Sequence, residues 1–327
     1  MRRFLLGMLF TVASAILLVR LIDWELAWGT LKTADAGYIA LAVTSLVLSL
    51  TAKSIRWRLL LPAESSVSTP RLYRILHISF LLNNVLPARL GDVARVAMTA
   101  KQPGLRFGHV VSSMLTERIT DIVVLVCCFI VVSPFLPIPD AYKDWLHLAW
   151  GGIGAGIVLT AAVVVLHRPL LTAARRLPQP RRLPGSIARL GEEAQSFREG
   201  WRQLFSRRQL LPIWGWSGVA WVGAFAINYL LMRALHIDAP ITVAVLLTCT
   251  TNLAMLVPSS PGYLGVFHAA ATLSLLPFDV GSSAALSFAI LAHLVNVLPV
   301  SLIGAAFLLA NRDQVDLPWR RKQPDAQ

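Results

Sequence analysis

The sequence predicts an all-α integral membrane protein with about six spanning helices and two segments broken by proline and glycine. Hydrophobic residues make up 56% of the 327-residue chain. Only 14% of the residues are charged, whereas soluble domains carry about 25%. Long apolar runs also recur from one end of the chain to the other. These observations exclude an ordinary soluble enzyme, a disordered protein and a disulfide-stapled secreted domain.

Six apolar runs approach the roughly 20 residues that a helix needs to cross the hydrocarbon core of a bilayer. They cover residues 4–22, 38–59, 108–133, 145–167, 209–232 and 282–310. The first run is long and lacks a clear small-residue cleavage site, so we interpret it as a retained helix and not as a secretory signal. We therefore predict one membrane domain over residues 1–312, followed by a cytoplasmic tail at 313–327.

Two further apolar stretches, at 75–99 and 240–276, are interrupted in the middle. The interrupting residues are Pro87 and Gly91 in the first stretch, and Pro258, Gly262 and Gly265 in the second. Backbone that leaves the helix at membrane depth must be buried in protein or face a water-filled cavity. We therefore predict a re-entrant or hairpin tip at each interruption.

The layout of these segments suggests an internal repeat. A shift of 171 residues places Pro87 on Pro258 and Gly91 on Gly262. The order of span, broken segment and span then occurs twice, starting outside the first time and inside the second. Such an inverted-topology repeat is common in secondary transporters, whose substrate sites lie near the bilayer midplane where broken helices meet.

Basic residues predict the orientation of the chain. With a cytoplasmic N-terminus, 25 of the 30 Lys and Arg residues fall on the cytoplasmic side, as the positive-inside rule requires. This predicts a multi-pass protein of the bacterial cytoplasmic (inner) membrane with both termini inside. The net charge of +13 comes largely from such flanking residues, and no motif indicates nucleic acid as a partner.

The predicted loop 168–208 carries ten arginines. Apolar residues recur in it at three- and four-residue steps between Ile187 and Leu204. That pattern is typical of an amphipathic helix on an anionic membrane surface. A solvated basic loop is the alternative.

Charged residues inside the predicted spans are the first candidate site. Glu117, Arg118 and Asp121 stand about ten residues into the run at 108–133, where each charge costs at least ~2.5–3.5 kcal/mol. Their spacing places them close together on one helix. They form either a substrate-facing or proton-linked cluster, which we favour, or a structural group that neutralises itself.

A second candidate group follows the first tip. Arg89, Asp92 and Arg95 recur every three residues, on one face of a predicted short helix. Arginine binds phosphate through its planar fork of donors, so two guanidiniums beside a carboxylate suit an anionic headgroup. Alternatively, the arginines only mark the cytoplasmic interface, with Asp92 as their ion-pair partner.

Uncharged polar residues complete the candidates for substrate binding. Asn84 precedes the first tip and Asn252 the second, so their amides either line a cavity or tie the broken backbone together. His293 and Asn296 repeat the spacing of Arg118 and Asp121, and His268 follows the second tip. The histidines carry a proton or have a structural role. Because no Cys/His cluster has metal-ligand spacing, we predict no metal and no cofactor.

Three segments resemble the membrane region of lysylphosphatidylglycerol synthases and of related stand-alone flippase-like proteins. They read NNVLPARLGDVAR at 83–95, SSMLTERITD at 112–121 and NLAMLVPSSPGYLGVFHAA at 252–270. The resemblance extends over roughly residues 5–310 and implies a lipid-translocating bundle with two broken segments. It also implies that the charged candidates above, together with Gly91, occupy recurring polar positions of the family. Pro258, Gly262 and Gly265 match its second proline-glycine motif.

The chain departs from the family in two ways. Only 16 residues follow Asn311, so we expect no synthase domain and no lysine transfer from aminoacyl-tRNA. His293 stands near a position where the family usually has arginine, and Ser259 and Ser260 replace glycines. Both substitutions leave the headgroup preference open.

The sequence therefore predicts a non-enzymatic, flippase-like transporter. Its substrate would be an anionic phospholipid or a polyprenyl-phosphate-linked lipid, with Arg89 and Arg95 on the phosphate. The absence of an ATP-binding loop predicts passive or gradient-coupled movement. One alternative is an integral-membrane enzyme for a lipid-linked substrate. Another is a scaffold subunit that recruits a soluble lipid-modifying enzyme through the loop 168–208.

Overall fold

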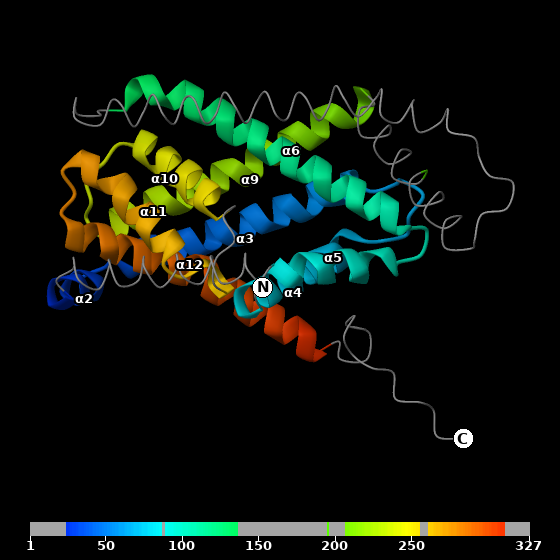
Figure 1. The fold of residues 1–327 in the computed structure, drawn as a ribbon, viewed down its shortest axis with the longest axis horizontal. Coiled ribbons are helices and arrows are strands. Elements are labelled where there is room, and N and C mark those ends of the chain that lie inside the picture. The colour runs from blue at the N-terminus through cyan, green and yellow to red at the C-terminus, as the bar shows by residue number, and fades with distance from the viewer. Residues whose placement is uncertain (1–23, 87–88, 137–194, 196–206, 256–260, 311–327) are drawn as a thin grey trace, which may run out of the picture.

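The computed structural model describes residues 24–86, 89–136, 195, 207–255 and 261–310 (Figure 1). In these ranges the chain forms helices joined by turns, without strands. The predicted spans at 4–22 and 145–167 lie outside the described residues. So do Pro87, Pro258 and nearly all of the basic loop.

Four long helices confirm four of the predicted spans. They are α3 (Ala36–Leu59), α6 (Phe107–Val132), α9 (Arg207–Ala234) and α12 (Ser282–Ala310). Each is long and apolar enough to cross a membrane, and α6 continues into the short helix η2 (Ser133–Phe135). A shorter helix, α2 (Trp24–Lys32), precedes α3 and packs against α12.

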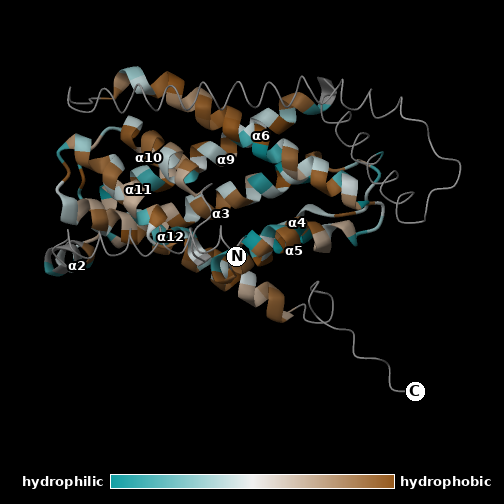
Figure 2. Ribbon diagram, in the orientation of Figure 1, coloured by the Kyte–Doolittle hydropathy of each residue, from teal (hydrophilic) through white to brown (hydrophobic). Residues whose placement is uncertain are grey.

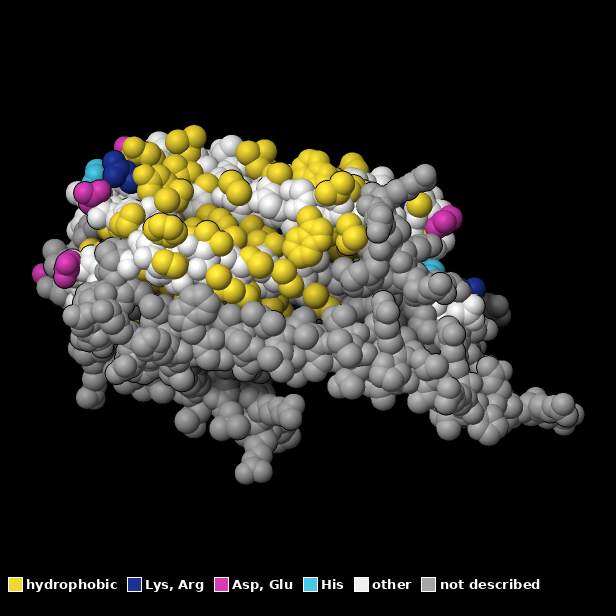
Figure 3. Space-filling view, turned by 90° about the horizontal axis from the view of Figure 1, so that it is seen from above, with side chains coloured by type: hydrophobic (Ala, Val, Ile, Leu, Met, Phe, Trp, Pro, Cys, Tyr) yellow, Lys and Arg dark blue, Asp and Glu magenta, His cyan; other side chains and the backbone are white. Residues whose placement is uncertain are grey.

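The surface of these helices is apolar, as a lipid-facing surface requires. Figure 2 shows apolar residues along all four long helices, with a few hydrophilic positions on α3 and α6. In Figure 3, hydrophobic side chains cover the middle of the described surface, and charged side chains lie toward its two ends. Leu48, Val131 and Val222 are each more than 60% exposed. The chain is thus a multi-pass membrane protein.

Small residues bring α3 and α9 together as antiparallel neighbours. The Ser45 hydroxyl donates to the Gly223 carbonyl at 3.1 Å, and the Ser49 hydroxyl donates to the Ala220 carbonyl at 2.7 Å. A Cβ on Gly223 would lie only 3.0 Å from the Ser49 Cβ. The main hydrophobic core lies beside this contact, between α3, α9, α10, α11 and α12.

The first broken stretch forms a helical hairpin of α4 (Thr69–Val85) and α5 (Leu90–Ala100). Gly91 allows the two helices to touch, since a Cβ there would lie 2.0 Å from the Ser79 carbonyl oxygen. The Asn83 side chain also bonds both the backbone N–H and the carboxylate of Asp92, at 3.2 and 3.1 Å. Between the helices, Arg89 adopts a left-handed conformation with φ 55°.

The second broken stretch contains α10 (Ile241–Ala254), η4 (Pro261–Tyr263), α11 (Val266–Leu275) and η5 (Leu276–Phe278). Gly262 and Gly265 have φ of 68° and 84°, a region that residues with a Cβ rarely adopt. These two glycines therefore lie in the turn between α10 and α11.

The two hairpins enter from opposite ends of the long axis and meet near its middle (Figure 1). Arg89 of the first tip donates to the Met255 carbonyl of the second, and its guanidinium carbon lies 5.5 Å from the centroid of the Tyr263 ring. The Asn84 amide donates to the Ser301 hydroxyl of α12 at 3.0 Å. These contacts place the polar tips of both hairpins side by side.

Candidate functional site

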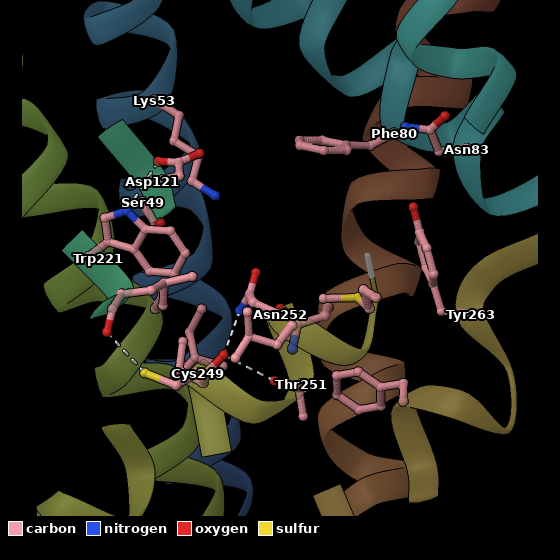
Figure 4. Close-up of a pocket in the computed structure, with 18 of the residues that line it drawn as sticks. Ser49, Lys53, Phe80, Asn83, Asp121, Trp221, Cys249, Thr251, Asn252 and Tyr263 are labelled. Carbon is pink, nitrogen blue, oxygen red and sulfur yellow. Dashed lines mark hydrogen bonds between the residues drawn. The ribbon is translucent and has the colours of Figure 1, made fainter. Parts of the chain in front are cut away.

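A cavity of about 840 Å³ lies where the two tips meet α3, α6, α9 and α12. Ten of the eleven predicted substrate-binding residues line it. They are Asn84, Arg89, Asp92, Arg95, Glu117, Arg118, Asp121, Asn252, His293 and Asn296. Figure 4 shows Lys53, Asp121 and Trp221 on one side of this cavity and Phe80, Asn83 and Tyr263 on the other.

The remaining predicted residue, His268, is not among the residues that line the cavity. Its ring centroid lies 4.8 Å from that of His293, so it sits directly behind a lining residue. The centroid of the Phe267 ring lies 6.0 Å from that of His268 and 5.4 Å from that of His293. The structure therefore places the two histidines together, with only His293 facing the cavity.

The cavity has an apolar part as well as a charged one. Leu125, Val126 and Phe129 line it from α6, and Val297 and Val300 line it from α12. A cavity with charged groups on one part of its wall and aliphatic groups on another matches a ligand that is itself amphipathic. Its volume falls within the range of about 300–1,000 Å³ that is usual for small-molecule sites.

Glu117 of α6 is bound by Arg95 of α5. The two guanidinium nitrogens of Arg95 reach the two carboxylate oxygens at 2.8 and 3.2 Å. The guanidinium also lies 3.7 Å from the centroid of the Trp57 ring, and Arg95 is buried. This bidentate geometry favours a positioning role for Arg95 over the direct phosphate contact expected from the sequence.

Asp121 of α6 is bound by Arg56 of α3. The Arg56 Nη1 lies 2.6 Å from the Asp121 Oδ1, and its Nη2 lies 3.7 Å from the nearer Glu117 oxygen. Nη1 also donates to the Ser217 hydroxyl of α9 at 3.1 Å. The indole N–H of Trp221 donates to the same Asp121 oxygen at 3.1 Å. A single buried arginine thus ties three helices together.

The third carboxylate, Asp92, lies 3.4 Å from Arg118 across the gap between α5 and α6. The alternative of a group of Glu117, Arg118 and Asp121 that neutralises itself on one helix does not hold, because the ion pairs run between helices. The spacing also predicted Arg89 on one helical face with Asp92 and Arg95. That placement is wrong, because Arg89 precedes the first turn of α5.

Two cations near the cavity have no carboxylate partner among the described residues, namely Lys53 and Arg89. The Lys53 ammonium lies 5.3 Å from the centroid of the Trp221 ring. Arg89 bonds the uncharged Met255 carbonyl and covers the Tyr263 ring. The cluster holds five cations, which are these two with Arg56, Arg95 and Arg118, against three carboxylates. It therefore carries a formal excess of two positive charges.

The asparagines serve both roles that the sequence left open. Asn252 and Asn296 line the cavity, and each donates from its amide nitrogen to the carbonyl four residues earlier, at 2.8 Å. Asn84 lines it too and holds α4 to α12. These amides fix the helices that surround the cavity.

Sequence reasoning missed Lys53 and Arg56. Both lie inside the predicted span 38–59, where the cost of an intramembrane charge was a usable signal. Trp57, Trp221 and Tyr263 carry no comparable signal, since aromatic residues are common in apolar helices. Across the described residues, no group of three or more His, Cys, Asp or Glu side chains is placed to hold a metal ion.

Comparison with known proteins adds one finding. The family model described as lysylphosphatidylglycerol synthase TM region matches residues 4–304. No curated protein matches the chain.

Proposed function

Because the chain belongs to the lysylphosphatidylglycerol synthase TM-region family, we propose that it moves an anionic lipid between membrane leaflets. The substrate would be an anionic phospholipid or a polyprenyl-phosphate-linked lipid in a bacterial cytoplasmic membrane. The observation that carries this proposal is the amphipathic cavity between the two hairpin tips, with its excess of positive charge. The headgroup would occupy the charged part of the wall, and the aliphatic chain would lie along the apolar part.

An inverted repeat would supply the motion. α3, the first hairpin and α6 run in directions opposite to α9, the second hairpin and α12 (Figure 1). Ser49 bonds Ala220, and these two positions are separated by the same 171 residues as Pro87 and Pro258. Two copies related by a two-fold axis contact each other at equivalent positions on that axis, so this bond supports the repeat.

In this account both hairpins are re-entrant and their tips meet at the depth where a headgroup must cross. Ion pairs attach the first hairpin to α6, and a further ion pair attaches α6 to α3. Arg89 is one contact between the two hairpins, and it bonds a carbonyl and an aromatic ring of the second. The weaker, uncharged contacts are those that separate as the two halves rock, which is the movement expected of inverted repeats.

The direct test is leaflet accessibility in vesicles. Purified full-length protein is reconstituted with a trace of headgroup-labelled phosphatidylglycerol or polyprenyl phosphate, and a membrane-impermeant reductant bleaches the label in the outer leaflet. We expect protein to raise the bleached fraction from about half toward completeness, because inner-leaflet lipid reaches the reductant. A bleached fraction equal to that of protein-free vesicles for every lipid would overturn the proposal.

A further inference from the structure

We propose that the cavity selects a lipid whose headgroup carries a phosphate and no ammonium, with Lys53 and Arg89 as the groups that bind the phosphate. This inference rests on the proposed function, since it assumes that the cavity receives a lipid headgroup. It narrows the substrate class to lipids with an ammonium-free phosphate headgroup and assigns a role to Lys53.

The carboxylates of the cavity are already engaged. Asp121 is bound by Arg56, Glu117 by Arg95 and Asp92 by Arg118. An ammonium group from an aminoacylated or zwitterionic headgroup would have to compete with an arginine for each of them. It would also add positive charge to a cluster that already has two cations in excess. At membrane depth the surroundings do little to screen that repulsion.

The two unpaired cations stand on opposite sides of the cavity. Lys53 projects from α3 beside Trp221 on one side, and Tyr263, which Arg89 covers, lies on the other (Figure 4). Replacing the neutral Met255 carbonyl with a phosphate oxygen would give Arg89 an anionic acceptor in place of a neutral one. A phosphate between the two sides would thus reduce the excess of positive charge and release one contact between the hairpin tips.

The binding chemistry is shared by two lipid sources, which are phosphodiesters such as phosphatidylglycerol and phosphomonoesters such as polyprenyl phosphate. We would measure equilibrium binding to the full-length protein in neutral detergent by calorimetry. The probes are dioctanoyl phosphatidylglycerol, farnesyl phosphate, dioctanoyl phosphatidylcholine and dioctanoyl lysylphosphatidylglycerol. Tighter binding of dioctanoyl phosphatidylglycerol would identify a phosphodiester, and tighter binding of farnesyl phosphate would identify a phosphomonoester.

We expect both ammonium-free phosphates to bind at least about tenfold more tightly than the two ammonium-bearing lipids, as one charged hydrogen bond would give. Lys53→Met should lose about tenfold in affinity for those phosphates, and Lys53→Arg should retain it. Lys32→Met is the matched control, because Lys32 also lies over an indole ring, 5.8 Å from that of Trp28, but outside the cavity. Its affinities should equal those of the wild type.

Equal binding of lysylphosphatidylglycerol and phosphatidylglycerol to the wild type would overturn the inference, and so would unchanged binding in Lys53→Met. If Lys53→Met does not fold, the inference is tested by the order of the four wild-type affinities and by the affinity of the Arg89→Gln variant for the two ammonium-free phosphates. Leaflet accessibility separates this inference from the proposed function. Lys53-dependent binding without lipid movement would contradict transport alone, whereas equal movement of both lipids would contradict selectivity alone.

Discussion

Arg56 on α3 and Asp121 on α6 form a 2.6 Å ion pair in which the arginine is completely buried. The two residues are 65 positions apart in the chain. Arg56 also approaches Glu117, which is held in turn by Arg95 of the first hairpin. This chain of charges joins two spans and a hairpin into one unit.

Removal of Arg56 should destabilise the protein strongly. Arg56→Met leaves the Asp121 and Glu117 carboxylates short of a counter-charge, and breaking a buried pair from one side costs about 3–5 kcal/mol. Thermal unfolding in detergent measures the loss. Asp121→Asn added to Arg56→Met should restore part of the stability, since it removes a stranded charge. An Arg56→Met protein as stable as the wild type would show that the pair contributes nothing.

Gly91→Ala should separate the two helices of the first hairpin. The added methyl would lie 2.0 Å from the Ser79 carbonyl oxygen, and such overpacking typically costs about 1–3 kcal/mol. Gly215→Ala is the matched control on α9, where a Cβ meets nothing within 4 Å. Unfolding temperatures in detergent compare the two variants. Equal temperatures would mean that α4 and α5 do not need this close contact.

Arg118→Ala should impair lipid movement at little cost to stability. Its side chain is 44% exposed, and its pair with Asp92 spans 3.4 Å, so the pair contributes about 0–1 kcal/mol. Arg233→Ala is the control, because Arg233 is 42% exposed and pairs with Asp238 at 3.5 Å, away from the cavity. Normal transport by Arg118→Ala in vesicles would exclude Arg118 from the lipid path.

Asp121→Asn is a poorer test of transport than Arg118→Ala. Asp121 accepts from both Arg56 and Trp221, so its loss disturbs α3 and α9 together with the cavity. Transport lost in this variant would therefore not separate a role in lipid movement from a role in folding.

Length and hydropathy predicted the helices well. Four described spans begin and end close to the predicted positions, because a bilayer-crossing helix is set by the length of its apolar run. Glycine also located the turn of the second hairpin, whereas Gly91 lies inside α5. Gly262 and Gly265 adopt the left-handed conformation that only glycine tolerates easily.

The sequence did not predict which charges pair. Spacing along one helix made Arg118 and Asp121 natural partners, yet Arg118 pairs with Asp92 and Asp121 with Arg56. Partners on other helices depend on how the helices pack, which local spacing does not encode. Lys53 and Arg56 were missed for a related reason, since they resemble the basic residues that flank a cytoplasmic helix end.

The most direct test of the account is to lock the two halves together by linking α4 to α12. Asn84→Cys and Ser301→Cys replace side chains that touch at 3.0 Å, in a background where Cys127, Cys128 and Cys249 are changed to serine. We predict that a short thiol-reactive, reducible cross-link stops lipid movement in vesicles, and that reduction of the same sample restores it. Fully cross-linked protein that moves lipid as fast as the reduced sample would contradict transport by movement of the two halves against each other.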